Sequence, residues 1–253
     1  MGRLICILGA LREEINLIKG QMTIDEQFKF ARADAWSGSW EGTHIVLVRT
    51  GIGKELALNA LKQALSLVRP SLILSIGYAG GLDPKLMVGD VVLADHVLKI
   101  NTGHDDCISY PIDLKQLELL EESACSNKVV FHKGKIITVD HVVGDPNVKQ
   151  ELGLRYNALA VDMETAVLVA YAAEQKIPFL SLRGISDTVK QSLVDTSSLI
   201  SDDGKVSKLK AGWYVIRRPH TIKNFISLRE QTQHATYNMT EFIRFFIRTH
   251  LNS

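Results

Sequence analysis

Cysteine, net charge and long apolar runs are all scarce in this sequence, and each scarcity excludes a class of protein. Three cysteines spread over 253 residues form neither a disulfide framework nor a metal-ligand pattern, and they predict a reducing compartment. The 29 basic residues nearly balance the 28 acidic ones, which argues against nucleic acid or an anionic membrane as partner. No run approaches the roughly 18 apolar residues that cross a bilayer. We expect a cytoplasmic protein without a transmembrane segment.

Hydrophobic residues make up 46% of the chain, which is enough for one large core. Short apolar runs alternate with segments of helical spacing. The predicted strands span residues 4–8, 71–77, 88–95, 135–140, 158–164 and 178–187, and the predicted helices span residues 11–21, 53–68, 113–126 and 165–176. Residues 34–51 predict two more strands joined by a turn near Glu41 and Gly42. This alternation predicts an α/β fold whose mixed, largely parallel central sheet is flanked by helices.

The C-terminal part has a different pattern. Residues 190–210 are polar and predict a loop, and residues 220–251 predict a long helix. The sequence shows no second core and no internal repeat. We therefore predict a single domain over residues 1–253, with a core to about residue 190 and a helical extension from about residue 205.

Polar or glycine-rich segments follow four of the predicted strands, at residues 9–14, 77–81, 162–164 and 183–187. In open α/β sheets, ligands bind beyond the carboxyl ends of the strands. These segments therefore predict a binding site with several carboxylates. Asp162 also fits the start of the following helix, where a carboxylate caps free amides, and both interpretations stay open.

Several common site motifs are missing. No GxGxxG follows the first strand, so a dinucleotide-binding oxidoreductase is not predicted. The segment "GIGKE" lacks the first glycine of a P-loop and the Ser or Thr after its lysine. The eight histidines form neither an HxxH nor an HExxH pattern. We expect no metal ion.

Five segments occur in a fixed order: "ILGALREEI", "TGIGK", "SIGYAGGL" with "VGDVVLAD", "VDMETA" and "LRGISDT". Together they resemble the nucleoside phosphorylase/nucleosidase superfamily, which includes methylthioadenosine/S-adenosylhomocysteine nucleosidases and purine nucleoside phosphorylases. The segments "AGGLDPKLMVGDVVLAD" and "YPID" and residues 202–235 are also similar to a hopanoid-associated phosphorylase branch. The resemblance implies a nucleoside phosphorylase-like fold and cleavage of a purine N-glycosidic bond.

The resemblance assigns roles to the residues at two strand ends. Asp187 matches the acid that protonates or hydrogen-bonds purine N7, and this role requires a carboxyl group held protonated by burial. Ser186 and Arg183 would orient it. Glu164 matches the carboxylate that binds the ribose hydroxyls, and Met163 would pack beneath the sugar. The resemblance also places six residues around base and sugar, namely Ile52, Tyr78, Ala79, Gly80, Val142 and Val143.

Two of these positions depart from the nucleosidase pattern. Tyr78 replaces a serine, which predicts a blocked or reshaped nucleophile pocket. Val142 replaces a stacking phenylalanine, which predicts a looser grip on the base.

The nucleophile decides the type of reaction. Glu14 matches the glutamate that activates water in the hydrolytic nucleosidases, whereas Arg12 and Gly9 in the same loop would suit phosphate, as would the amides of residues 77–81. Residues two apart on a helix face different sides, so Glu14 and Arg12 should not both face the ligand. We expect Glu14 to face inward and water to be the nucleophile.

Three functions stay open. The first is a hydrolase acting on methylthioadenosine or S-adenosylhomocysteine, and the second is a phosphorylase-like enzyme acting on adenosylhopane. The third, from another class, is a nucleoside-binding protein without catalysis. For all three, the resemblance implies a small nucleoside ligand, no organic cofactor and a homo-oligomer, with phosphate open as a co-substrate.

Overall fold

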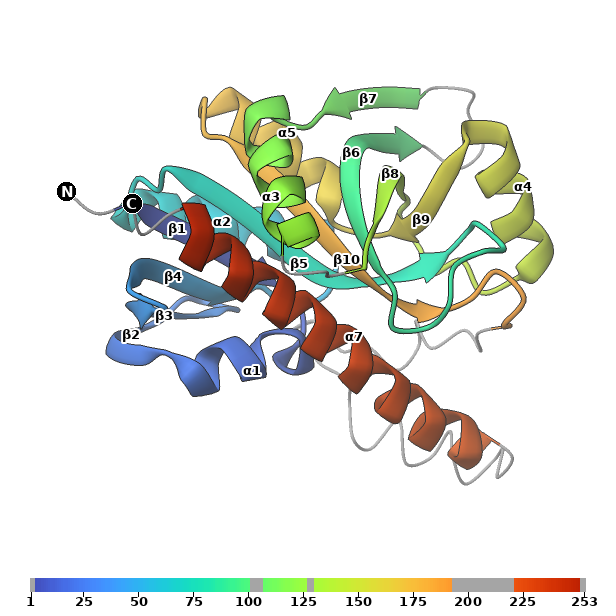
Figure 1. Cartoon of the computed structure of the whole chain (residues 1–253), viewed down its shortest axis with the longest axis horizontal. Coiled ribbons are helices and arrows are strands. Elements are labelled where there is room, and N and C mark those ends of the chain that lie inside the picture. Colours follow the sequence, from blue (N-terminus) through green and yellow to red (C-terminus); the bar gives the residue numbers. More distant parts are fainter. Residues whose placement is uncertain (1–2, 101–106, 127–129, 193–220, 251–253) are drawn as a thin grey trace.

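The computed structural model describes residues 3–100, 107–126, 130–192 and 221–250, with the side chains of all but 123–126 and 221–232. A ten-stranded sheet runs through it, with helices packed around it (Figure 1). The strands are β1 (Leu4–Gly9), β2 (Thr23–Lys29), β3 (Asp34–Trp40), β4 (Thr43–Arg49), β5 (Leu72–Gly81), β6 (Val91–Ile100), β7 (Cys107–Pro111), β8 (His132–Thr138), β9 (Ala158–Asp162) and β10 (Phe179–Asp187). The helices are α1 (Arg12–Gln21), α2 (Lys54–Leu67), α3 (Leu114–Ser126), α4 (Pro146–Tyr156), α5 (Thr165–Glu174) and α7 (Thr221–His250).

The sheet is mixed and partly closed. Its strands follow the order β10-β6-β8-β9-β5-β1-β4-β3-β2, and β7 pairs with β6. Because β10 also pairs with β5, the strands β5, β10, β6, β8 and β9 form a ring. Five pairings between described strands are parallel and five are antiparallel. The predicted mixed α/β fold is confirmed, but the sheet is less parallel than we expected, because β10–β6 and β5–β9 are antiparallel.

Three elements were not predicted, and each lacks a clear hydrophobic pattern. All residues of the edge strand β2 are exposed except the half-buried Phe28. The short strand β7 is mostly exposed as well. Helix α4 begins after Asp145, whose side chain accepts a hydrogen bond from the Asn147 amide at 2.8 Å. It ends at Asn157, which adopts the left-handed conformation with φ of 47°.

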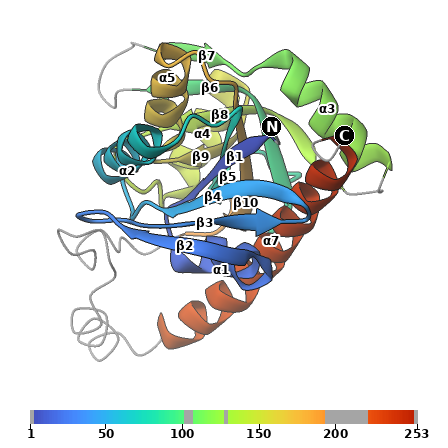
Figure 2. The same cartoon turned by 90° about the vertical axis from the view of Figure 1, so that its left-hand side faces the viewer.

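The long C-terminal helix α7 lies against the body of the protein. It packs across β10 and contacts α1 and α3 (Figures 1 and 2). Its inward face carries Ala235, Met239, Phe242 and Phe246, all fully buried. A Cβ atom on Gly184 of β10 would lie 2.7 Å from the Ala235 Cβ atom, so this glycine permits the close approach of helix and strand. The helix is therefore part of the main core.

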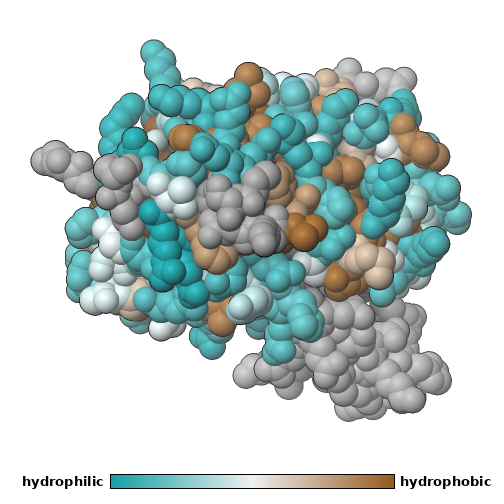
Figure 3. Space-filling model, in the orientation of Figure 1, coloured by the Kyte–Doolittle hydropathy of each residue, from teal (hydrophilic) through white to brown (hydrophobic). Residues whose placement is uncertain are grey.

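The face of the molecule shown in Figure 3 has no single large apolar patch among its described residues. On the face shown in Figure 3, hydrophobic side chains occur in separate places among hydrophilic ones. Of the helices that the structure describes, none combines the length and the apolar character needed to cross a membrane.

Candidate active site

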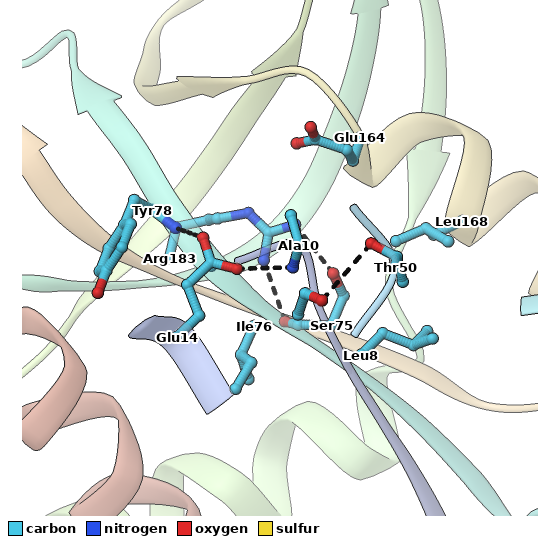
Figure 4. Close-up of a pocket in the computed structure, with 12 residues that line it drawn as sticks. Leu8, Ala10, Glu14, Thr50, Ser75, Ile76, Tyr78, Glu164, Leu168 and Arg183 are labelled. Carbon is cyan, nitrogen blue, oxygen red and sulfur yellow. Dashed lines mark hydrogen bonds between the residues drawn. The ribbon is translucent and has the colours of Figure 1, made fainter. Parts of the chain in front are cut away.

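A pocket opens beyond the carboxyl ends of β1, β4 and β5, which are neighbours in the sheet (Figure 4). Its lining residues are Leu8, Gly9, Ala10, Glu14, Thr50, Ser75, Ile76, Gly77, Tyr78, Glu164, Leu168 and Arg183. The pocket therefore collects residues from all four polar or glycine-rich strand-end segments of the sequence. Two carboxylates and one guanidinium group face it.

Glu14 is held at the pocket by backbone amides. Its Oε2 atom accepts hydrogen bonds from the amides of Ala10 at 2.6 Å and Leu11 at 2.9 Å. Its Oε1 atom accepts one from the Tyr78 amide at 3.0 Å. The side chain is only 4% exposed, and this burial raises the pKa of Glu14, although the three amides and Arg183 oppose the rise. A carboxylate has about four acceptor positions, so one remains for a ligand.

Two glycines leave the space that Glu14 occupies. A Cβ atom on Gly77 would lie 3.1 Å from Glu14 Oε1. A Cβ atom on Gly9 would lie 2.5 Å from Ile15 Cγ2, where α1 folds back onto β1. Gly9 at the end of β1 and Gly77 within β5 therefore let the first turn of α1 approach the sheet.

Glu164 lies across the pocket from Glu14 (Figure 4). Strand β9 ends earlier than we predicted, at Asp162, and Glu164 is half-buried just before α5. Its Oε1 atom accepts a hydrogen bond from the Gly53 amide at 2.8 Å. Burial and the nearby Asp162 carboxylate raise the pKa of Glu164 to about 7, and the Gly53 amide and Arg183 oppose this rise.

Arg183 is buried between the two glutamates and does not orient Asp187, which corrects the sequence-based expectation. Its Nε atom donates to Asp162 Oδ2 at 2.9 Å, and its terminal nitrogens donate to Ser75 and Thr165. The guanidinium lowers the pKa of both Glu14 and Glu164, and partners on β5, β9 and α5 fix its position. It therefore contributes positive charge to the pocket.

Asp162 has a structural role in this arrangement. Its Oδ1 atom accepts from the Thr138 hydroxyl at 2.6 Å, and its Oδ2 atom accepts from the Thr165 amide at 3.1 Å, the Thr165 hydroxyl and Arg183. The carboxylate therefore has protein partners on both oxygens and does not line the pocket. Of the two interpretations left open, the geometry favours the cap at the start of α5 over a substrate contact.

Asp187 lies at the end of β10, outside the pocket lining, and is 2% exposed. Its Oδ1 atom accepts from the Ser186 hydroxyl at 2.6 Å, as the expected orienting role of Ser186 requires. Its Oδ2 atom pairs with the ammonium group of Lys149, which is fully buried. Asp187 therefore has a buried cation beside it, which the sequence-based expectation of burial alone did not include.

The remaining predicted residues are arranged around these groups. Ala79 accepts a hydrogen bond from Ser186 through its carbonyl oxygen at 3.2 Å, and Gly80 lies beside Asp187. Ile52 is half-buried in the turn that presents the Gly53 amide to Glu164. Three other side chains do not line the pocket, namely the half-buried Met163 and Val142 and the buried Val143.

Arg12 and Tyr78 both turn away from the pocket. Arg12 is exposed and is not part of the lining, whereas Gly9 and Glu14 are. Tyr78 faces the pocket with its backbone, and its hydroxyl forms a hydrogen bond with Thr236 Oγ1 on α7 at 2.5 Å. Its ring points away from Glu164 (Figure 4). The tyrosine at this position therefore connects the pocket wall to the C-terminal helix.

Comparison with known proteins agrees with this geometry. Residues 4–210 match the family model described as the Phosphorylase superfamily. The chain belongs to this superfamily. It is 27% identical to the 5′-methylthioadenosine/S-adenosylhomocysteine nucleosidase of Bacillus subtilis over 234 residues, which cover 85% of this chain and 99% of that protein. It is 32% identical to the nucleosidase of the same name from Marinomonas sp. over 196 residues, which cover 72% of this chain and 85% of that protein.

Solved structures share the fold. The 5′-methylthioadenosine/S-adenosylhomocysteine nucleosidase of Neisseria meningitidis, in complex with methylthio-immucillin-A, superposes with a TM-score of 0.77 at 21% identity, covering 98% of this chain and 99% of the other. The futalosine hydrolase of Helicobacter pylori superposes with a TM-score of 0.74 at 20% identity, covering 96% and 98% of the two chains. The resemblance found in the sequence is thus confirmed at the level of the superfamily.

Sequence reasoning missed three polar residues of this superfamily member. Thr50 and Ser75 line the pocket, and Ser75 holds Arg183 through its hydroxyl at 2.9 Å. The sequence of α4 does not predict that Lys149 is buried. Its neighbour Val148 is more hydrophobic and yet 42% exposed, so hydrophobicity gives the wrong order of burial here. Within the described ranges, no group of three histidine, cysteine, aspartate or glutamate side chains could hold a metal ion.

Proposed function

We propose that this member of the phosphorylase superfamily is a purine nucleosidase that cleaves the N-glycosidic bond of a 5′-modified adenosine and releases adenine. The names of its curated relatives describe nucleosidases of methylthioadenosine and S-adenosylhomocysteine. A related solved structure holds methylthio-immucillin-A. The family likeness covers the β1, β5, β9 and β10 strand ends, which carry the ionisable residues of the site.

The reaction requires help at three points, and the structure has a candidate for each. The departing purine gains negative charge, the ribose becomes oxocarbenium-like, and a nucleophile must attack the sugar. Asp187 is the candidate for the purine. Glu164 has oxygen acceptors left for a vicinal diol, because the structure gives it one hydrogen bond, from Gly53. Its negative charge also favours a cationic sugar.

The orientation of Glu14 and Arg12 supports water as the nucleophile. Glu14 is buried at the pocket with one acceptor position left, and Arg12 is exposed outside it. Burial raises the pKa of Glu14, which suits a base that takes a proton from water. A phosphate ion would lie near two carboxylates, and like charges in a pocket of low dielectric repel strongly. Arg183 is already bound to Asp162 and Ser75.

Product analysis tests the proposal. The intact protein is incubated with methylthioadenosine, S-adenosylhomocysteine, futalosine and adenosine, with and without phosphate. We expect adenine and a free 5′-modified sugar from at least one of the adenosine compounds, at a rate independent of phosphate. A sugar 1-phosphate formed only in the presence of phosphate would contradict hydrolysis, and the absence of base release from every compound would contradict the enzyme assignment.

The 5′ substituent, the assembly and the location of the enzyme are finer proposals. Residues 202–235 resemble the hopanoid-associated branch, and residues 202–220 lie outside the described part of the chain. An adenosine with a long apolar 5′ chain therefore belongs in the substrate panel. From the family likeness we also propose a homo-oligomer working in the cytoplasm. Light scattering coupled to size-exclusion chromatography tests the assembly, and cell fractionation tests the location.

A further inference from the structure

Lys149 is an unusual residue for the interior of a protein. Its side chain is fully buried, and taking an ammonium group out of water is costly unless all its protons are bound. The three donors of Lys149 Nζ meet Asp187 Oδ2, the Thr188 carbonyl oxygen at 3.2 Å and the Gln191 carbonyl oxygen at 3.0 Å. All three acceptors belong to the end of β10 and the turn that follows it.

The packing of α4 against β5 places Lys149 next to Asp187. Helix α4 packs tightly on the end of β5, where a Cβ atom on Gly153 would lie 2.8 Å from the Leu82 carbonyl oxygen. Gly80 leaves room for the lysine stem, since a Cβ atom there would lie 3.7 Å from Lys149 Cε and 3.2 Å from Asp187 Oδ2. Buried ion pairs seldom increase stability over apolar residues of similar size, so a functional reason for this pair is favoured.

We propose that Lys149 is a positioning residue for Asp187 and that the two side chains form one acid unit with a single transferable proton. This rests on the proposed function. An ionised Asp187 has no proton to give to purine N7, and the ammonium group supplies the missing one. As the C1′–N9 bond breaks, its electron pair moves to the purine. The proton of Lys149 passes to the Asp187 carboxylate and from there to N7, so that Asp187 ends the step ionised, as it began.

The remaining atoms balance at the other carboxylate. Water adds its hydroxyl oxygen to C1′ and gives a proton to Glu14. Lys149 is then a neutral amine and Glu14 a neutral acid, and exchange with solvent returns the proton to Lys149. The carbonyl groups of Thr188 and Gln191 keep the amine aligned with Asp187 in both states.

A leaving-group experiment tests the acid unit. Lys149→Met keeps the apolar stem and removes the ammonium group, and Lys85→Met at an exposed position serves as the matched control. Each variant is assayed with methylthioadenosine and with a 4-nitrophenyl 5-methylthioriboside, whose leaving group needs no proton. We expect Lys149→Met to lower kcat on methylthioadenosine about 10²–10⁴-fold, the usual contribution of general acid catalysis, and to spare the nitrophenyl substrate.

Further variants separate this role from a purely structural one. Asp187→Asn and the double variant Lys149→Met/Asp187→Asn should match the single lysine variant, because the pair acts as a unit. The double variant leaves no unpaired buried charge, so it also reports if the single variant does not fold. Equal losses on both substrates, or wild-type activity of Lys149→Met on methylthioadenosine, would overturn the acid unit. Absence of adenine release by the wild-type enzyme would instead overturn the proposed function.

Discussion

Two buried carboxylates, Glu14 and Asp187, lie on either side of the glycine-rich end of β5 and have opposite surroundings. Glu14 is held by three neutral backbone amides, and burial raises its pKa. Asp187 is held by a hydroxyl group and by the ammonium group of Lys149. The first environment suits a group that accepts a proton, and the second suits a group that passes one on. In the reaction proposed above, environment and not residue type would therefore distinguish the base, Glu14, from the acid, Asp187.

Of the two carboxylates compared, Glu14 should have the largest effect on catalysis when it is replaced. Glu14→Gln keeps the size of the side chain but cannot accept a proton from water, so we expect kcat to fall about 10²–10⁴-fold, with or without phosphate. Rates of adenine release from methylthioadenosine measure the loss. Arg12→Gln, on the same helix but exposed, is the control and should stay near wild type. Phosphate-dependent activity in Glu14→Gln would show that water is not the nucleophile.

Glu164→Gln should have the next largest effect. The amide keeps an acceptor for the ribose hydroxyls and loses the charge that favours a cationic sugar, so kcat should fall about 10²-fold while KM changes little. Steady-state kinetics with methylthioadenosine separate the two parameters. A raised KM with unchanged kcat would mean that Glu164 only binds the ground state.

The raised pKa of Glu164 predicts that both the activity and the stability of the protein depend on pH. Since the pKa is about 7 in the folded protein against 4.5 for an ordinary glutamate, kcat/KM should rise as the pH passes 7 and Glu164 ionises near Asp162, Arg183 and Glu14. A folded protein that binds the proton more tightly than the unfolded chain loses stability as the pH rises. The free energy of unfolding should therefore fall between pH 4.5 and 7.

Denaturant titrations across this range measure that fall. The fall should be smaller in Glu164→Gln than in the wild type, because the variant has no proton to lose at this position. An identical pH dependence in the two proteins would contradict the assignment of the raised pKa to Glu164.

Two glycine variants should disturb one carboxylate each. A Cβ atom would lie 3.1 Å from Glu14 Oε1 in Gly77→Ala and 3.2 Å from Asp187 Oδ2 in Gly80→Ala, so each carboxylate must shift by a few tenths of an ångström. Misplacement by about 1 Å can cost about 10²-fold, and we expect roughly tenfold here. The nitrophenyl substrate distinguishes them, because Gly77→Ala should slow both substrates and Gly80→Ala only methylthioadenosine. The same pattern in both variants would refute separate roles.

The smallest effect is expected where the pocket wall meets α7. Tyr78→Phe removes the hydrogen bond to Thr236, so the free energy of unfolding should fall by about 1 kcal/mol. Thermal denaturation measures the change, and kcat should be nearly unaffected because the ring points away from Glu164. A large loss of activity in this variant would mean that α7 positions Glu14 through the Tyr78 amide.

The sequence predicted those parts of the fold that have strong local patterns. Strands β1, β5 and β10 are rich in apolar residues, α2 carries an apolar stripe with helical spacing, and α5 is apolar almost throughout. The strand ends that hold Glu14, Glu164 and Arg183 could be recognised because carboxyl ends of neighbouring strands meet at one edge. The edge strand β2 and helix α4 could not, because tertiary contacts and not hydrophobic periodicity keep them in place.

The sequence by itself located the buried strands along the chain, because apolar periodicity and glycine-containing turns are local properties, and five of its motifs indicated the superfamily by resemblance. Only the tertiary structure decided what surrounds each carboxylate. Glu14 accepts a hydrogen bond from the Tyr78 amide, 64 residues away in the sequence. Asp187 pairs with Lys149, 38 residues away, on helix α4, which no local pattern predicted. Protonation depends on charges and burial within a few ångströms, and those distances exist only once the chain has folded.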